Sequence, residues 1–244
     1  MYGWRLRIGV IAPANNAVIE PELNRRLPDG VALLATKLQG STGEMAEGNI
    51  VAMESTTERA VRMLDVAEVG VMVYACMGTA LVKGVEWSNR LRAEMRALTR
   101  AQVVTAAQLT MDGLRLLGVR RVAIATPYPE LLQPKVRPYF EAHGFEVVSE
   151  RHLGVANVRQ VGSYGPEAAY HLVRSLDVSR ADGVCILATD FRTFEALEWI
   201  ERDLGKPVVS TNQAILWGSL RAGGLTEEIA GYGRLLRDTR RIPE

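Results

Sequence analysis

A cysteine at the end of a short apolar run is the residue of this sequence best suited to nucleophilic or proton-transfer chemistry. Cys76 ends the run VGVMVYAC (69–76) and is followed by small residues. A thiol near a helix N-terminus can have its pKa lowered, so that it acts as a nucleophile or proton donor at neutral pH. A free cysteine is also commonly an inert core residue, and position alone leaves that alternative open. Cys185 lies in the middle of the run GVCILAT (183–189), and we predict it to be a core side chain.

The residues that follow the other apolar runs are mostly polar, uncharged and rich in hydrogen-bond donors. Together with Cys76 they occupy positions 13–16, 76–79, 127–128, 157, 188–190 and 211–213. Such a set suits a carboxylate held by amides, hydroxyls and backbone N–H groups at helix N-termini, rather than by arginine side chains. A small mono- or dicarboxylate is therefore the expected ligand.

Motifs for the common cofactors are missing. No GxGxxG follows the first apolar run, and the sequence has neither a phosphate loop GxxxxGK[ST] nor an HExxH motif. The two cysteines, Cys76 and Cys185, lack the spacing of a zinc site or a disulfide framework. We therefore expect no cofactor and no metal.

Composition and charge exclude several classes of partner. The chain has 244 residues, 48% of them hydrophobic, which is enough to fill a sizeable core. Lysine and arginine number 29 against 28 acidic residues, so no basic face for nucleic acid is expected. The opening MYGWRLRIGVIAPANN has an apolar run far shorter than the roughly 20 residues of a membrane helix. We expect a cytoplasmic protein without membrane or nucleic-acid partners.

The elements that must position these residues follow a regular alternation. Short β-branched runs occupy 7–13, 31–38, 69–76, 102–108, 121–127, 146–153, 183–189 and 207–212. Amphipathic stretches lie between them, most clearly at 86–98, 110–117, 193–204 and 212–222. Buried runs of this length alternating with helices predict an α/β fold with parallel sheets.

The sequence contains an internal repeat, in which three segments of the first half recur in the second half. RIGVIAP returns as RVAIATP, EVGVMVYAC as ADGVCILAT, and QVVTAAQLTMDGLRLLG as KPVVSTNQAILWGSLRAGG. Three pairs in the same order indicate two similar half-domains, which we place at 1–108 and 109–212, with a C-terminal helix at 213–244 crossing back to the first. Ligands of open α/β sheets bind beyond the carboxyl ends of the strands, so a site in the cleft between the halves is expected.

Several of these segments resemble the maleate cis–trans isomerases and arylmalonate decarboxylases of the aspartate/glutamate racemase superfamily. The resemblance is carried by PANNAVIEPE (13–22), YACMGTALVKG (74–84), ATPY (125–128) and the run from 182 to 217. The segments GLRLLGVRRVAIAT (113–126) and GYGRLL (231–236) are most similar to the decarboxylases. The resemblance implies two pseudo-symmetric Rossmann-like half-domains, a cofactor-independent enzyme acting on a small dicarboxylate, and a homo-oligomer.

Carried over position by position, the resemblance makes Cys76 the catalytic nucleophile. It implies that the substrate is bound by the other matching residues: Asn16, Met77, Gly78, Thr79, Tyr128, Asn157, Thr189 and Asp190. One departure concerns the family's second cysteine, usually found in S-C-T-N-L-R-T. That position is Ala188 here, and Asp190 replaces the asparagine.

The missing second thiol decides which reactions remain open. Racemisation in this superfamily uses one thiol on each face of the substrate, which disfavours a racemase. The first hypothesis is a maleate isomerase-like enzyme, which adds a cysteine thiolate to the double bond. The alternative is an arylmalonate decarboxylase-like lyase with Cys76 as its single proton donor. A third hypothesis is a non-catalytic carboxylate-binding protein on the same scaffold.

Overall fold

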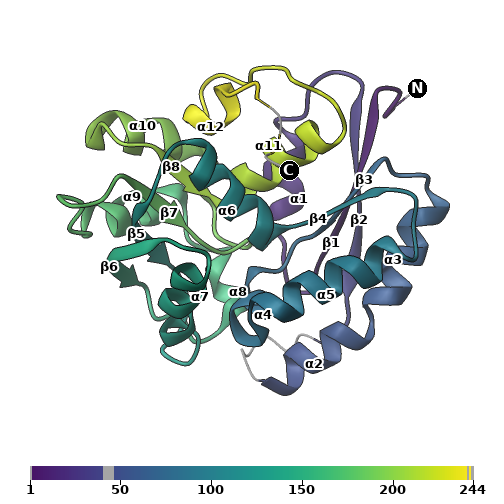
Figure 1. Cartoon of the computed structure of the whole chain (residues 1–244), viewed down its shortest axis with the longest axis horizontal. Coiled ribbons are helices and arrows are strands. Elements are labelled where there is room, and N and C mark those ends of the chain that lie inside the picture. The colour runs from purple at the N-terminus through teal and green to yellow at the C-terminus, as the bar shows by residue number, and fades with distance from the viewer. Residues whose placement is uncertain (1, 41–46, 241, 243–244) are drawn as a thin grey trace.

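A computed structural model describes residues 2–40, 47–240 and 242, and it shows two four-stranded parallel sheets side by side (Figure 1). The first sheet has the strand order β2-β1-β3-β4. Its strands are β1 (Leu6–Pro13), β2 (Val31–Leu38), β3 (Val71–Tyr74) and β4 (Gln102–Thr105). α3 (Thr57–Val66) and α5 (Val85–Arg96) cover one face, while α1 (Ile19–Asn24) packs on the other.

The second sheet repeats this order as β6-β5-β7-β8. Its strands are β5 (Arg121–Thr126), β6 (Glu146–His152), β7 (Gly183–Ile186) and β8 (Val208–Ser210). They are accompanied by η1 (Gln133–Lys135), α7 (Val136–Ala142), α9 (Pro166–Arg174) and α10 (Phe194–Leu204). RIGVIAP and RVAIATP are thus the equivalent inner strands β1 and β5, and the predicted fold of two similar parallel halves is confirmed.

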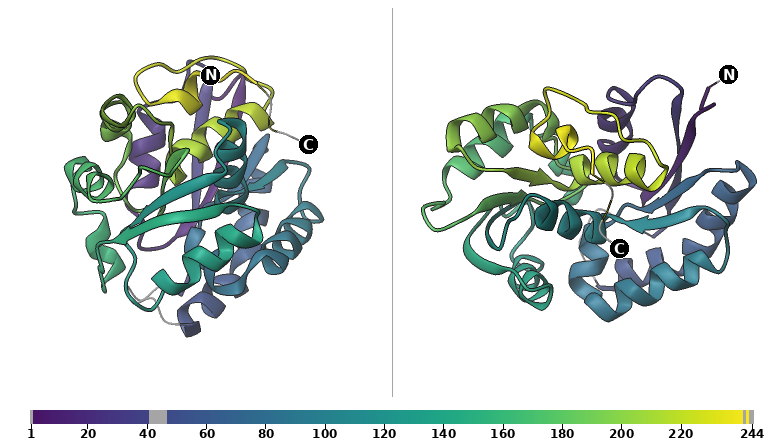
Figure 2. Two further views of the ribbon diagram at one scale, coloured as in Figure 1. Left: turned by 60° about the vertical axis from the view of Figure 1, so that its left-hand side comes forward. Right: turned by 45° about the horizontal axis from the view of Figure 1, so that its top comes forward.

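Two helices join the halves. α6 (Ala106–Leu116) and α11 (Thr211–Ala222) pack against each other, and α11 also contacts β3 and β4 of the first sheet (Figures 1 and 2). One continuous hydrophobic cluster therefore contains buried residues from both sheets. A loop and the short α12 (Arg234–Arg237) follow α11. The proposed boundaries at 108/109 and 212/213 remain predictions.

The strands before α6 and α11 end earlier than the sequence predicted. The run at 102–108 was expected to be extended throughout, and the amphipathic stretch was expected to begin at 110. Instead, the Thr105 hydroxyl accepts the N–H of Gln108 at 3.1 Å, so that α6 starts at once. Ser210 does the same with Gln213 at 3.3 Å, and the Gln213 side chain accepts the N–H of Ser210. The β-branched residues before Thr105 and Ser210 favour a strand, which is why the sequence predicts a longer one. The hydrogen bonds of these two capping side chains start the helix earlier.

The remaining helices are short or lie at the edges. They are α2 (Glu47–Ser55), α4 (Met77–Lys83) and α8 (Val158–Val161). Within the described part of the chain, no helix has both the length and the apolar composition that crossing a membrane requires.

Removing the two equivalent caps should destabilise the fold by different amounts. We expect Thr105→Ala to lower the free energy of unfolding by about 1 kcal/mol. Ser210→Ala should lower it further, because the buried Thr193 hydroxyl, which donates to Ser210 at 2.9 Å, would lose its acceptor. Urea denaturation measures both, with the exposed Thr226→Ala as the control. A loss in Ser210→Ala no greater than in Thr105→Ala would contradict this account of the junction.

Candidate active site

Cys76 lies between the end of β3 and the first residue of α4. Its side chain is buried, with 8% of the residue exposed. Burial raises the pKa of the thiol, and the N–H groups of Thr79 and Gly78 oppose that rise without overcoming it. In the resting structure the thiol is therefore neutral, contrary to the expectation that the helix N-terminus lowers its pKa. A seven-residue helix that begins in the core cannot offset the desolvation of a thiolate.

The turn after Cys76 is buried together with it. Met77, Gly78 and Thr79 form the first turn of α4, and the Thr79 hydroxyl donates to the Cys76 carbonyl oxygen at 3.1 Å. Cys185 is fully buried in β7, and burial raises its pKa strongly. The prediction that Cys185 is a core residue is confirmed.

The loop that follows β7 is held against the end of β3. The Thr189 hydroxyl donates to the Ala75 carbonyl oxygen at 3.3 Å and accepts a hydrogen bond from Asn16 Nδ2 at 2.9 Å. Ala188 has a φ of 89°, a left-handed conformation that is unfavourable for a residue with a Cβ. Such a conformation persists where neighbouring residues hold it in place. Here the next residue, Thr189, is held by its hydrogen bonds to the Ala75 carbonyl oxygen and to Asn16.

Asn16 is buried in the turn between β1 and α1, where it joins the two halves. Its Oδ1 accepts the N–H groups of Val18 and Ile19, each at 3.0 Å, and so supports the start of α1. Its Nδ2 is used by Thr189. Asn16 therefore acts in the resting structure as a structural link, and its predicted contact with a substrate carboxylate remains a prediction.

Two supporting residues were given no role by the sequence, although Asn212 stands among the polar residues at 211–213 that follow an apolar run. Asn212, at the start of α11, donates to the Thr189 carbonyl oxygen at 3.0 Å and to Glu22 Oε2 at 2.7 Å. Glu22 Oε1 accepts the N–H of Thr193 at 2.9 Å. Burial raises the pKa of Glu22, and these hydrogen bonds partly offset that rise. The sequence feature that could have identified Glu22 is its position on the apolar face of α1, three residues after the buried Ile19, where a carboxylate is unusual.

Tyr128 and Asp190 approach Cys76 from the second half. Tyr128 follows β5 and is only 5% exposed, and within the described residues its hydroxyl has no hydrogen-bond partner. Its pKa is raised well above its usual range by burial, and further by the charge of Asp190. Asp190 is partly exposed, and the low polarity around it raises its pKa to about 6.

Asn157 lies at the margin of this group. Its side chain is exposed and caps α8 by accepting the N–H of Arg159 at 3.0 Å. The C-terminal end of α8 lies next to the site. Its capping residue Gly162 is so close to the loop after β7 that a Cβ atom at this position would be 3.8 Å from the Asp190 carbonyl oxygen. The structure thus brings together Cys76, Met77, Gly78, Thr79, Asn16, Tyr128, Thr189 and Asp190, whereas the Asn157 side chain faces solvent.

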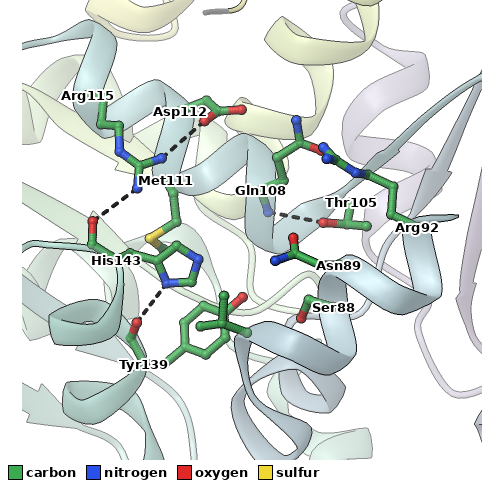
Figure 3. Close-up of a pocket in the computed structure, with 11 residues that line it drawn as sticks. Ser88, Asn89, Arg92, Thr105, Gln108, Met111, Asp112, Arg115, Tyr139 and His143 are labelled. Atoms are coloured by element: carbon green, nitrogen blue, oxygen red, sulfur yellow. Dashed lines mark hydrogen bonds and ion pairs between the residues drawn. The ribbon is translucent and has the colours of Figure 1, made fainter. Parts of the chain in front are cut away.

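A separate polar pocket of about 300 Å³ lies between α5, α6 and α7 (Figure 3). His143 lines it and is held through Nδ1 by the Tyr139 carbonyl oxygen at 2.8 Å, while burial lowers the pKa of its imidazole. None of the predicted site residues lines this pocket. Between residues 2 and 240, excluding 41–46, no group of three or more potential metal ligands occurs.

Known proteins resemble the chain over almost its full length. The profile of the arylmalonate decarboxylase family matches residues 8–236. A maleate isomerase from Nocardia farcinica is 33% identical over 95% of both chains. An arylmalonate decarboxylase from Bordetella bronchiseptica is 30% identical over 95% of this chain and 97% of its own.

A solved structure of the N. farcinica maleate isomerase superposes with a TM-score of 0.88, at 33% identity, over 95% of this chain and 98% of that chain. That structure is a cysteine-to-serine variant with a covalently bound succinylcysteine intermediate. These likenesses confirm the expected class, a cysteine-dependent isomerase or decarboxylase, and leave the branch open. The chain belongs to the arylmalonate decarboxylase family.

Proposed function

We propose that the protein isomerises a cis-dicarboxylate of the maleate type through covalent addition of Cys76. The observation that carries this proposal is the position of Cys76. Its thiol lies beside the N–H groups of Gly78 and Thr79, and the loop after β7 is bonded to the preceding residue, Ala75. In the N. farcinica relative, the intermediate is a succinyl group bound to a cysteine. A single thiol at the end of β3 is the group that this chemistry requires.

In the proposed reaction, the Cys76 sulfur bonds to one carbon of the double bond as the S–H bond breaks. The electron pair of the double bond moves to the neighbouring carbon and its carboxylate, and that carbon takes up a proton. Rotation about the new single bond, loss of the proton and expulsion of the thiolate give the trans isomer. Because the resting thiol is neutral, its deprotonation has to accompany the addition.

Several hydrogen-bond donors near Cys76 support the binding of two substrate carboxylates. The N–H groups of Gly78 and Thr79 face the region of the sulfur, and Tyr128 offers a buried hydroxyl with no partner within the described residues. A buried hydroxyl without a partner is costly, which supports a role in meeting a substrate oxygen. Asn16 and Thr189 lie beside them, joined by their own hydrogen bond.

One observation favours a second candidate, an arylmalonate decarboxylase-like reaction. A neutral thiol is the correct protonation state for a group that donates a proton to a carbanion after loss of carbon dioxide. The two candidates are separated by incubating the protein with maleate and with phenylmalonate while following fumarate and carbon dioxide. Carbon dioxide release without fumarate would replace the first proposal by the second.

Two finer properties are proposed on the sequence and the family likeness alone. We propose that the protein acts in the cytoplasm and forms a homo-oligomer. Light scattering coupled to size exclusion tests the second point, and a monomer at all concentrations would contradict it.

Replacing the thiol should abolish turnover of maleate. In Cys76→Ser the acidic group has a far higher pKa and forms a poorer nucleophile and leaving group, so kcat should fall by roughly 10³-fold or more. Fumarate formation followed by absorbance measures the effect. Cys185→Ser is the matched control, because that sulfur is buried inside β7. Full activity in Cys76→Ser would show that neither thiol-dependent reaction is correct.

Removing the Tyr128 hydroxyl should reduce activity without weakening the fold. If the hydroxyl binds a substrate carboxylate, Tyr128→Phe should lower kcat/KM roughly 10- to 150-fold, the equivalent of a hydrogen bond to a charged group. Because the hydroxyl has no partner within the described residues, the melting temperature should stay the same or rise. Tyr139→Phe, in the separate pocket, serves as the control. A lower melting temperature with unchanged kcat/KM would assign the hydroxyl a structural role instead.

A further inference from the structure

The proposed reaction needs a group that carries a proton between sulfur and carbon. By resemblance, the family places a second thiol on the loop after β7, where this chain has Ala188. A methyl group cannot transfer a proton. Any replacement must lie within reach of the Cys76 thiol and of a substrate bound beside it.

The loop after β7 brings a carboxyl group to that region. Thr189 is fixed to the Ala75 carbonyl oxygen, one residue before Cys76, and Asp190 is the next residue along the loop. The charge of Asp190 raises the pKa of both the Cys76 thiol and the Tyr128 phenol, which places the carboxylate in the neighbourhood of both groups. Asp190 therefore lies close enough to Cys76 of the first half and Tyr128 of the second half to act on both electrostatically.

Within the described residues, little stabilises the ionised form of the Asp190 carboxylate. No charged group within the described residues lowers its pKa, and the only interaction that does so is a hydrogen bond with its own backbone N–H. The titratable groups that face it are Cys76 at the start of α4 and Tyr128 after β5, both neutral when Asp190 ionises. A carboxylate held near a neutral thiol without a compensating cation is unfavourable for folding, and such groups concentrate at active sites.

We propose that Asp190 is the acid–base group of this site and takes the place of the thiol that is absent at position 188. The inference rests on the proposed function and deepens it. Asp190 would be a catalytic residue in the strict sense, exchanging protons with the thiol and with the substrate.

The steps balance with one proton and no further reactant. The Asp190 carboxylate accepts the thiol proton as sulfur bonds to one alkene carbon, and the resulting carboxylic acid donates that proton to the neighbouring carbon. After rotation, Asp190 removes a proton from the same carbon, the double bond reforms as the carbon–sulfur bond breaks, and the thiolate recovers the proton. The partial exposure of Asp190 also allows exchange with solvent.

The protonation state that the reaction requires of Asp190 determines how kcat/KM depends on pH. Asp190 must be ionised in the free enzyme, so kcat/KM should rise through an acid limb with a pKa of about 6 and level off above it. The same raised pKa means that ionisation of Asp190 opposes folding at pH values above about 6, and that this penalty disappears as the pH falls toward about 4.

The test uses Asp190→Asn, which keeps the size of the side chain and removes its acid–base function. We expect turnover of maleate to fall by about 10²- to 10⁴-fold and the acid limb near pH 6 to disappear. The melting temperature should rise relative to wild type at about pH 8 and match it near about pH 4. A residue with a purely structural role would instead lower the melting temperature when replaced.

A double variant and a control complete the design. Ala188→Cys combined with Asp190→Asn restores the family's second thiol and should recover turnover at least tenfold over Asp190→Asn alone. Asp177→Asn, on an exposed loop, makes the same chemical change away from the site and should leave turnover unchanged.

A second measurement needs no substrate. In the resting protein the charge of Asp190 raises the pKa of Cys76, so Asp190→Asn should shift the pH profile of Cys76 alkylation by iodoacetamide to lower pH. An unshifted profile would overturn the inference even if wild type did not act on maleate. Wild-type turnover of maleate together with full activity in Asp190→Asn would overturn it while leaving the proposed function intact.

Discussion

The arrangement of this site depends on one buried hydrogen-bond network that ties the loop after β7 to the end of β3. Thr189 is its centre, bonded to Asn16, to the Ala75 carbonyl oxygen and to Asn212. Asn212 in turn binds Glu22, which also receives the N–H of Thr193. These bonds hold Ala188 in an unfavourable backbone conformation and fix the distance between the two halves where they meet. Loss of any one member would leave buried polar groups unpaired, which is why the network acts as a unit.

The proposed reaction requires Cys76 and Asp190 to gain and lose protons in a site of low polarity. Burial keeps the Cys76 thiol and the Tyr128 phenol neutral, and the low polarity around the partly exposed Asp190 raises its pKa to about 6. The N–H groups of Gly78 and Thr79 provide the fixed dipoles on the other side. In the proposed reaction a proton moves directly between the Cys76 thiol, the substrate carbon and the Asp190 carboxylate, so water need not take part in the transfer.

Much of the fold followed from the sequence because each half repeats the same apolar runs in the same order. The repeat RIGVIAP and RVAIATP identified the equivalent strands β1 and β5, and strand-end positions identified Cys76, Asn16, Tyr128 and Thr189 as neighbours. The helix starts at Ala106 and Thr211 were misplaced because β-branched residues favour a strand until a capping side chain intervenes. The neutral thiol was not foreseen because burial depends on packing between halves. The roles of Glu22 and Asn212 were not foreseen, although Asn212 was among the strand-end residues, because the partners of both lie in distant segments.

The proposed function requires that Cys76 forms a covalent bond with a cis-dicarboxylate. Acid quenching of the wild-type protein during turnover of maleate, followed by intact-mass measurement and peptide mapping, tests this claim most directly. We expect a species heavier by one maleic acid, with the added mass on the peptide that contains Cys76 and none on the peptide that contains Cys185. Turnover of maleate with no such species at any quench time, or an adduct on Cys185 instead, would contradict it.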